Sequence, residues 1–74
     1  MNERNERILR VIGEALNNPM VYRISINHER NRIKIYVKNI TDSQDHIYIE
    51  DLKRKIKYYG FDPKRTKEGF VIYL

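Results

Sequence analysis

The chain has 74 residues, of which 41% are hydrophobic and 34% charged, and its formal net charge is +5. This length predicts a single domain, residues 1–74, and the composition is that of a small globular domain and not of a disordered tail. The absence of cysteine excludes a disulfide scaffold, a thiolate zinc site and a catalytic thiol. No apolar run reaches the roughly 18 residues of a membrane span, and the N-terminus lacks a signal-peptide pattern. We therefore expect a cytoplasmic protein that contacts no membrane.

Residues 3–17 predict an amphipathic helix. The apolar side chains that recur at helical spacing are Ile8, Leu9, Ile12, Ala15 and Leu16, with Val11 at the margin of the stripe. Pro19 cannot continue this helix and ends it. Gly13 lies inside it, where glycine costs about 1 kcal/mol, and we attribute it to close packing of the helix on a sheet.

Residues 21–27 and 32–39 alternate between apolar and polar side chains, which predicts two half-buried strands joined by a four-residue loop. One face of this hairpin would carry Tyr22, Ile24, Ile26, Ile33, Ile35 and Val37. The opposite face would carry Arg23, Ser25, Asn27, Arg32, Lys34, Tyr36 and Lys38.

The second half of the chain begins with an ambiguous segment, residues 46–49, whose β-branched and aromatic side chains favour a third strand over the first turn of a helix. The period then becomes helical and ends at Gly60, a left-handed stop. A basic loop, residues 64–69, leads to a last strand, residues 70–74. The predicted fold class is α+β: two helices on one face of a small, mostly antiparallel sheet of three or four strands, in the order α-β-β-(β)-α-β.

This order is similar to that of the double-stranded RNA-binding domain over residues 3–60, and the basic run at residues 53–55 adds to the similarity. The glycine-proline-histidine loop of that family is missing, because residues 27–31 read Asn-His-Glu-Arg-Asn, and a strand after the second helix also departs from it. We do not assign the chain to that family.

The excess of positive charge is concentrated in residues 53–67, which carry +6, after residues 38–52, which carry −3. A cluster of basic side chains in the second helix and the following loop suits phosphate contact, since it can release counterions from a nucleic-acid backbone. The residues predicted to make these contacts are Lys53, Arg54, Lys57, Lys64, Arg65 and Lys67. The alternative is a solvated helix face, because acidic residues at a helix start and basic ones at its end are favoured by the helix dipole.

The polar face of the predicted sheet is a second candidate surface. Basic and aromatic side chains on an open sheet suit single-stranded nucleic acid, where rings stack on bases and cations meet phosphates. The residues assigned to it are Arg23, Arg32, Lys34, Tyr36 and Lys38, with Tyr48, Val71 and Tyr73 as further members. The same face could instead be solvated, or could form a dimer interface through its tyrosines.

No pattern indicates catalysis. The two histidines, His28 and His46, have no metal-ligand spacing, and Ser25 and Ser43 have no nucleophile motif. We therefore expect a binding protein without metal or cofactor, whose partner is nucleic acid of unspecified type. The alternative is a protein-interaction module, either a homodimer or a small regulator that docks on a larger partner. The abundant Glu and Arg would fit a thermophilic source, and the size a viral protein.

Overall fold

The computed structural model describes residues 3–74, which form two helices and one four-stranded antiparallel sheet. In chain order the elements are α1 (Glu3–Leu16), β1 (Val21–Asn27), β2 (Arg32–Val37), α2 (Ser43–Tyr58), β3 (Pro63–Arg65) and β4 (Gly69–Tyr73). The predicted α+β fold is confirmed, and the sheet has the strand order β1-β2-β4-β3. None of the described helices is long and apolar enough to cross a membrane.

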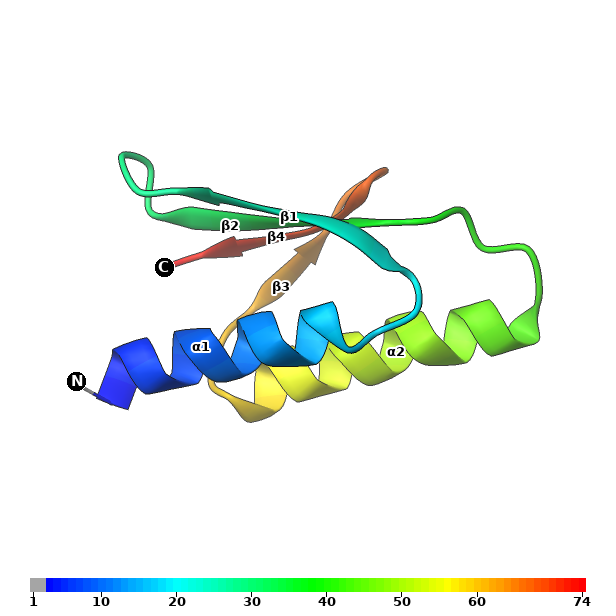
Figure 1. Ribbon diagram of the computed structural model, residues 1–74, viewed down its shortest axis with the longest axis horizontal. Helices are drawn as coiled ribbons and strands as arrows, with labels where there is room; N and C mark the ends of the chain where they lie inside the picture. The colour runs from blue at the N-terminus through cyan, green and yellow to red at the C-terminus, as the bar shows by residue number, and fades with distance from the viewer. Residues whose placement is uncertain (1–2) are drawn as a thin grey trace.

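The molecule has two layers, with both helices on the same side of the sheet (Figure 1). Helix α1 packs against β1 and α2, and α2 packs against β3. The core between the layers is built from apolar side chains of both helices and of the inner sheet face. Its most deeply buried members are Val11, Ala15, Ile33, Ile35, Leu52, Ile56, Phe70 and Ile72.

Helix α1 forms as predicted, but its buried stripe is narrower and rotated. Val11 is 1% exposed and lies at the centre of the contact, whereas Leu9 and Leu16 are 53% and 70% exposed. The helix packs along Ile8, Val11 and Ala15, spaced by three and four residues, so the leucines lie at its flank. The packing explanation for Gly13 is wrong, because a Cβ there would have no atom within 4 Å.

The β1–β2 hairpin also forms as predicted, with one irregularity that changes its faces. A register shift between Val21 and Arg23 leaves Tyr22 as an extra residue opposite β2. Tyr22 was predicted to lie on the inner face, but it is 61% exposed and its ring contacts Tyr36, on the side away from the helices. The assignment of Tyr22 to the core face is therefore wrong.

The prediction of a third strand at residues 46–49 is wrong, because this segment belongs to α2, which begins at Ser43. Asp42 caps the helix by accepting a hydrogen bond from the backbone N–H of Asp45. The Asp45 carboxylate in turn accepts hydrogen bonds from the backbone N–H and hydroxyl of Thr41. These caps satisfy donors that would otherwise be orphaned, and they fix the start of the helix despite the β-branched residues that follow.

This correction also ends the similarity to the double-stranded RNA-binding domain. Only two strands, β1 and β2, lie between the helices, and two more follow α2. Helix α2 ends at Tyr58, and the predicted stop, Gly60, follows two residues later with a φ of 91°. The Gly60 N–H donates to Lys57 O and the Phe61 N–H to Ile56 O, which is the hydrogen-bond pattern of a glycine-terminated helix.

Candidate functional site

The four strands contain all of the excess positive charge. They hold five basic residues and no acidic one, whereas the two helices hold seven basic and six acidic residues. We call the sheet surface turned away from the helices the outer face. The strand register places on it Arg23, Ser25, Asn27, Arg32, Lys34, Tyr36, Lys64, Gly69, Val71 and Tyr73, together with the displaced Tyr22.

Two arginines of the outer face lie against tyrosine rings. The guanidinium carbon of Arg23 is 5.1 Å from the centre of the Tyr36 ring, and that of Arg32 is 5.2 Å from the centre of the Tyr73 ring. The Tyr22 and Tyr36 rings are 6.2 Å apart and tilted by 48°. Such contacts hold the long arginine side chains flat on the sheet without neutralising their charge.

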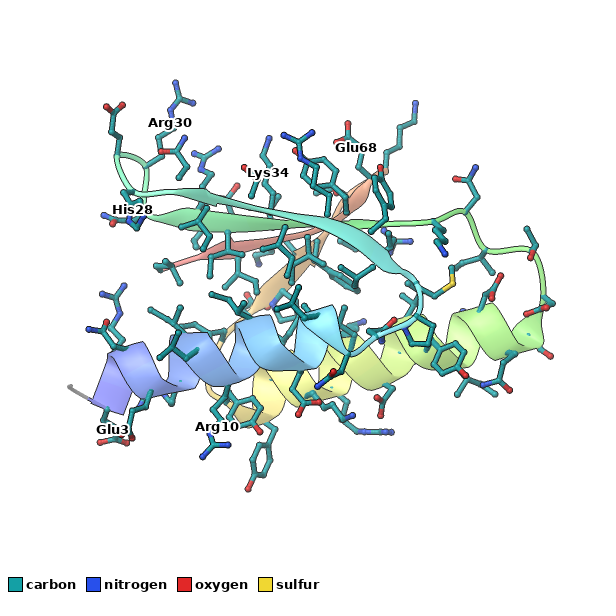
Figure 2. All side chains as sticks on the ribbon, in the orientation of Figure 1. Glu3, Arg10, His28, Arg30, Lys34 and Glu68 are labelled. Carbon is teal, nitrogen blue, oxygen red and sulfur yellow. The ribbon has the colours of Figure 1, made fainter. Side chains whose placement is uncertain are left out.

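Lys34 lies at the centre of the outer face, paired in the sheet with Ser25 on one side and Val71 on the other. Figure 2 shows Lys34 and Arg30 pointing away from the helices, on the side opposite Glu3 and Arg10. Val71 lies on the outer face, paired with Lys34 and Lys64, and is only 8% exposed although it is not part of the core cluster. The polar side of the sheet is thus a packed surface of basic and aromatic groups.

Two shallow hollows flank Lys34 and Tyr36. One, of about 190 Å³, lies between the β2–β4 pair and the turn after β3, and Lys67 and Glu68 are part of its wall. The other, of about 160 Å³, extends toward the hairpin loop and is lined by Arg30, Arg32 and Asn27, among others. Neither is a closed cavity, so the surface can admit an extended ligand along its length but does not enclose a small molecule.

The cations of residues 53–67 do not form one patch. Lys53, Arg54 and Lys57 belong to α2 in the helical layer. Lys64 lies on the outer face, and Lys67 borders the outer hollow beside Lys34 and Tyr36. Of the six cations predicted to contact phosphates, Lys64 and Lys67 are therefore the two that lie close to the predicted sheet residues such as Lys34 and Tyr36.

Arg65 is held by the β3–β4 turn. Its guanidinium donates to the carbonyls of Thr66 and Gly69, at 2.6 and 2.8 Å, and lies 5.3 Å from the centre of the Phe70 ring. Lys38 follows the end of β2, in the connection to α2. The pKa of Asp45 is lowered mainly by the hydrogen bond from the Thr41 backbone, and the charge of Lys38 adds to this shift. Arg65, paired in the sheet with the buried Phe70, faces the core side of the sheet, and Lys38 lies beyond the last residue of β2.

The two layers differ in how their cations pair with carboxylates. In α2, Asp51 accepts from Arg54 at 2.6 Å and from Lys55 at 2.9 Å, and Lys55 also reaches Glu14 of α1 at 3.1 Å. The hydrogen bond from Lys55 lowers the pKa of Asp51, and the pKa of Lys55 is raised in return. Among residues 3–74, no carboxylate pairs with Arg23, Arg32, Lys34 or Lys67 of the outer surface.

Lys64 is the exception on the sheet. Its ammonium lies 2.9 Å from the Asp62 carboxylate, which raises the pKa of Lys64 and lowers that of Asp62. Glu68, on the turn, lines the hollow beside Lys67 and lies on the same side of the sheet as Lys34 (Figure 2). The outer surface is therefore strongly basic along β1 and β2 and more balanced near β3.

Two tyrosines of the outer face were not central to the prediction from sequence: Tyr22 was assigned to the inner face, and Tyr73 was named only as a further member of the polar face. Tyr73 and Val71 do lie on the outer face, whereas Tyr48 lies in α2, where its carbonyl accepts from Asn18. The signal for Tyr22 was weak: β1 has one residue more than β2. The part of the chain that the structure describes contains no group of three or more potential metal ligands.

A scan of protein-family models, a search of curated proteins and a search of solved structures find no match to this chain. A function for this chain is therefore inferred from the chemistry of its surface.

Proposed function

We propose that this chain is a small, non-enzymatic nucleic-acid-binding protein that contacts phosphates with the outer face and with the turn after β3. The observation that carries the proposal is the charge of the outer face, where the strands place four basic residues, Arg23, Arg32, Lys34 and Lys64, and no acidic one. Binding to a polyanion releases its condensed counterions, and a surface that combines several cations with few carboxylates gains most from this release. A cytoplasmic location belongs to the same proposal.

The phosphate contacts would come from cations that are not already paired. Arg23, Lys34 and Lys67 have no carboxylate partner among the described residues, so a phosphate need not displace one. Arg23 and Arg32 lie on rings that leave their charge available. The backbone of a nucleic acid could thus lie along β2, between the hairpin loop and the β3–β4 turn.

The α2 residues Lys53, Arg54 and Lys57 form the other possible phosphate surface, in the opposite layer (Figure 1). Arg54 is engaged with Asp51, and the neighbouring acidic residues lower the local potential. Because the two surfaces belong to different layers, substitutions can test them separately.

The test compares two triple variants that lower the net charge equally. One is Arg23→Gln, Lys34→Gln and Lys67→Gln on the outer surface; its matched control is Lys53→Gln, Arg54→Gln and Lys57→Gln on α2. Binding to labelled DNA and RNA would be measured by fluorescence anisotropy from about 50 to 200 mM salt. In a plot of the logarithm of the binding constant against the logarithm of the salt concentration, loss of three phosphate contacts reduces the steepness of the slope by about 2 to 3. We expect this loss for the outer triple and a nearly unchanged slope for the α2 triple.

The reverse result, a reduced slope only for the α2 triple, would move the interface to the helical layer. Absence of binding to any nucleic acid by the parent chain at about 50 mM salt would overturn the proposed function.

A second candidate function, protein interaction, is favoured by apolar exposure beside an open sheet edge. Strand β1 lies at the edge, and Leu9, Leu16 and Ile26 are exposed by 53%, 70% and 45%. A hollow of about 320 Å³, lined in part by Ile8 and Ile12, lies between α1 and β1. An unpaired edge with apolar neighbours suits strand pairing with a second copy. Light scattering over a range of concentrations would show this homodimer, and a monomer throughout would exclude it.

A further inference from the structure

The outer face carries two exposed aromatic rings at opposite ends. Tyr22 is 61% exposed and lies next to Tyr36, at the β1 bulge; Tyr73 is 56% exposed and pairs with Arg32, near the other end of β2. The bulge is what brings Tyr22 to this face, since regular alternation would have turned its ring toward the helices. A solvated sheet has no need of two large exposed rings backed by arginines.

Each exposed ring is supported from one side. The Tyr22 ring contacts the Tyr36 ring, and the Arg23 guanidinium lies over the Tyr36 ring. The Tyr73 ring contacts the Arg32 guanidinium. These neighbours limit the rotamers of the tyrosines, so less freedom is lost when a flat group stacks on the exposed side. The nucleobases are the flat groups that a phosphate-binding surface would meet.

The spacing of the rings suits consecutive parts of one strand of nucleic acid. Tyr73 lies at the level of Arg32 and Tyr22 at the level of Tyr36, which is about 13 Å along β2. Lys34 lies between these levels, without a carboxylate partner among residues 3–74. A ring, a cation and a ring therefore follow one another diagonally across the sheet.

We infer that the outer face binds single-stranded nucleic acid, with bases stacked on Tyr22 and Tyr73 and the intervening phosphates at Lys34. This inference rests on the proposed function and adds the strandedness of the ligand. The charge of the face selects a polyanion, and the rings select unpaired bases, because the bases of a duplex are stacked on each other and cannot lie flat on a sheet. DNA and RNA strands share this chemistry.

The test removes the rings while leaving every charge in place. The double variant Tyr22→Ser, Tyr73→Ser is compared with Tyr58→Ser, which removes a ring that is 82% exposed but lies on α2. Each is titrated at low salt with oligo(dT), oligo(rU) and a DNA duplex. We expect the double variant to lose at least tenfold in affinity for both single strands, because stacking contributes strongly to each base contact. Tyr58→Ser should bind like the parent chain.

Two further measurements separate stacking from a folding defect. The ring-preserving variant Tyr22→Phe, Tyr73→Phe should restore binding, and far-UV circular dichroism should be the same for all variants. The chain has six tyrosines and no tryptophan, so quenching of tyrosine fluorescence by oligo(dT) reports on the rings directly. The quenching should be smaller in the serine double variant.

The outcomes distinguish this inference from the proposed function. Salt-dependent binding that the serine double variant retains in full, or equal affinity for duplex and single strand, would overturn stacking and leave the phosphate-binding function standing. Absence of binding by the parent chain to all three probes would overturn both.

Discussion

The helical layer and the sheet differ in their balance of charged residues: acidic and basic side chains are nearly equal in number in the helices, whereas the strands are purely basic. The helices carry seven basic and six acidic residues, and several are paired within or between helices, as in the Glu14–Lys55–Asp51 chain. The strands carry five basic residues and no acidic one. Helical spacing brings opposite charges three or four residues apart into contact, whereas the strand register places no carboxylate beside the cations of the outer face. The net charge of +5 is thus a property of the sheet.

The largest predicted effect is a loss of stability in the sheet, caused by substitution of Gly69, whose φ is 155°. A Cβ at this position would lie 1.8 Å from the carbonyl oxygen of Ile35, in the neighbouring strand. We expect Gly69→Ala to separate β2 from β4 and to lower the free energy of unfolding by about 4 kcal/mol or more. Urea denaturation followed by circular dichroism measures this loss; a change below about 1 kcal/mol would mean that the strands can shift to admit a methyl group.

The elements that sequence reasoning predicted correctly are those set by local pattern. Alternation fixed the faces of Ile24, Ile33 and Ile35, and the glycine at residue 60 fixed the end of α2. The start of α2 was missed because residues 46–49 favour a strand by composition, whereas hydrogen bonds accepted by the Asp42 and Asp45 carboxylates, from Asp45 N–H and Thr41 N–H, fix the start of the helix. The spacing of Asp42 and Asp45 is itself a capping signal that could have predicted this start.

The candidate site was less accessible to sequence reasoning because it depends on contacts between distant residues. The bulge at Tyr22 depends on how β1 pairs with Val37 and Tyr36, about fifteen residues later. Charge counted along the chain joined α2 to the following loop, yet the fold sends Lys64 to the outer face and leaves Lys53 in the helical layer. Counting charge along the chain therefore grouped cations that the fold places in different layers.

A smaller effect of opposite sign is expected in the helical layer at Gly13. Nothing lies within 4 Å of a Cβ added there, so Gly13→Ala meets no clash and only reduces the freedom of the unfolded chain. We expect it to raise the free energy of unfolding by about 0.5–1 kcal/mol. Measured in the same denaturation series as Gly69→Ala, it should leave nucleic-acid binding unchanged; a destabilised Gly13→Ala would show that α1 needs this glycine for a reason other than space.

The smallest expected effect concerns pH and acts on the helical layer alone. The pKa of Asp51 is lowered mainly by its hydrogen bond from Lys55, so Asp51 stabilises the folded chain above its unfolded pKa of about 3.9. This contribution is lost as the pH falls through the lower folded value. The pKa of Lys55 is raised, so its own contribution is lost only as the pH rises through its folded value, above about 10.4.

The parent chain should therefore have a higher Tm than Asp51→Asn at pH 7, and this difference should shrink as the pH falls below about 3.9 and through the lower folded pKa of Asp51. The strands carry no carboxylate, so the charge of their side chains stays constant over the same range while the helical layer becomes strongly positive. Acid would thus erase the contrast between the layers by changing only one of them. Thermal melts of both proteins between pH 7 and 3 measure this convergence, and a Tm difference that persists unchanged at pH 3 would show that Asp51 stabilises the fold other than by its charge.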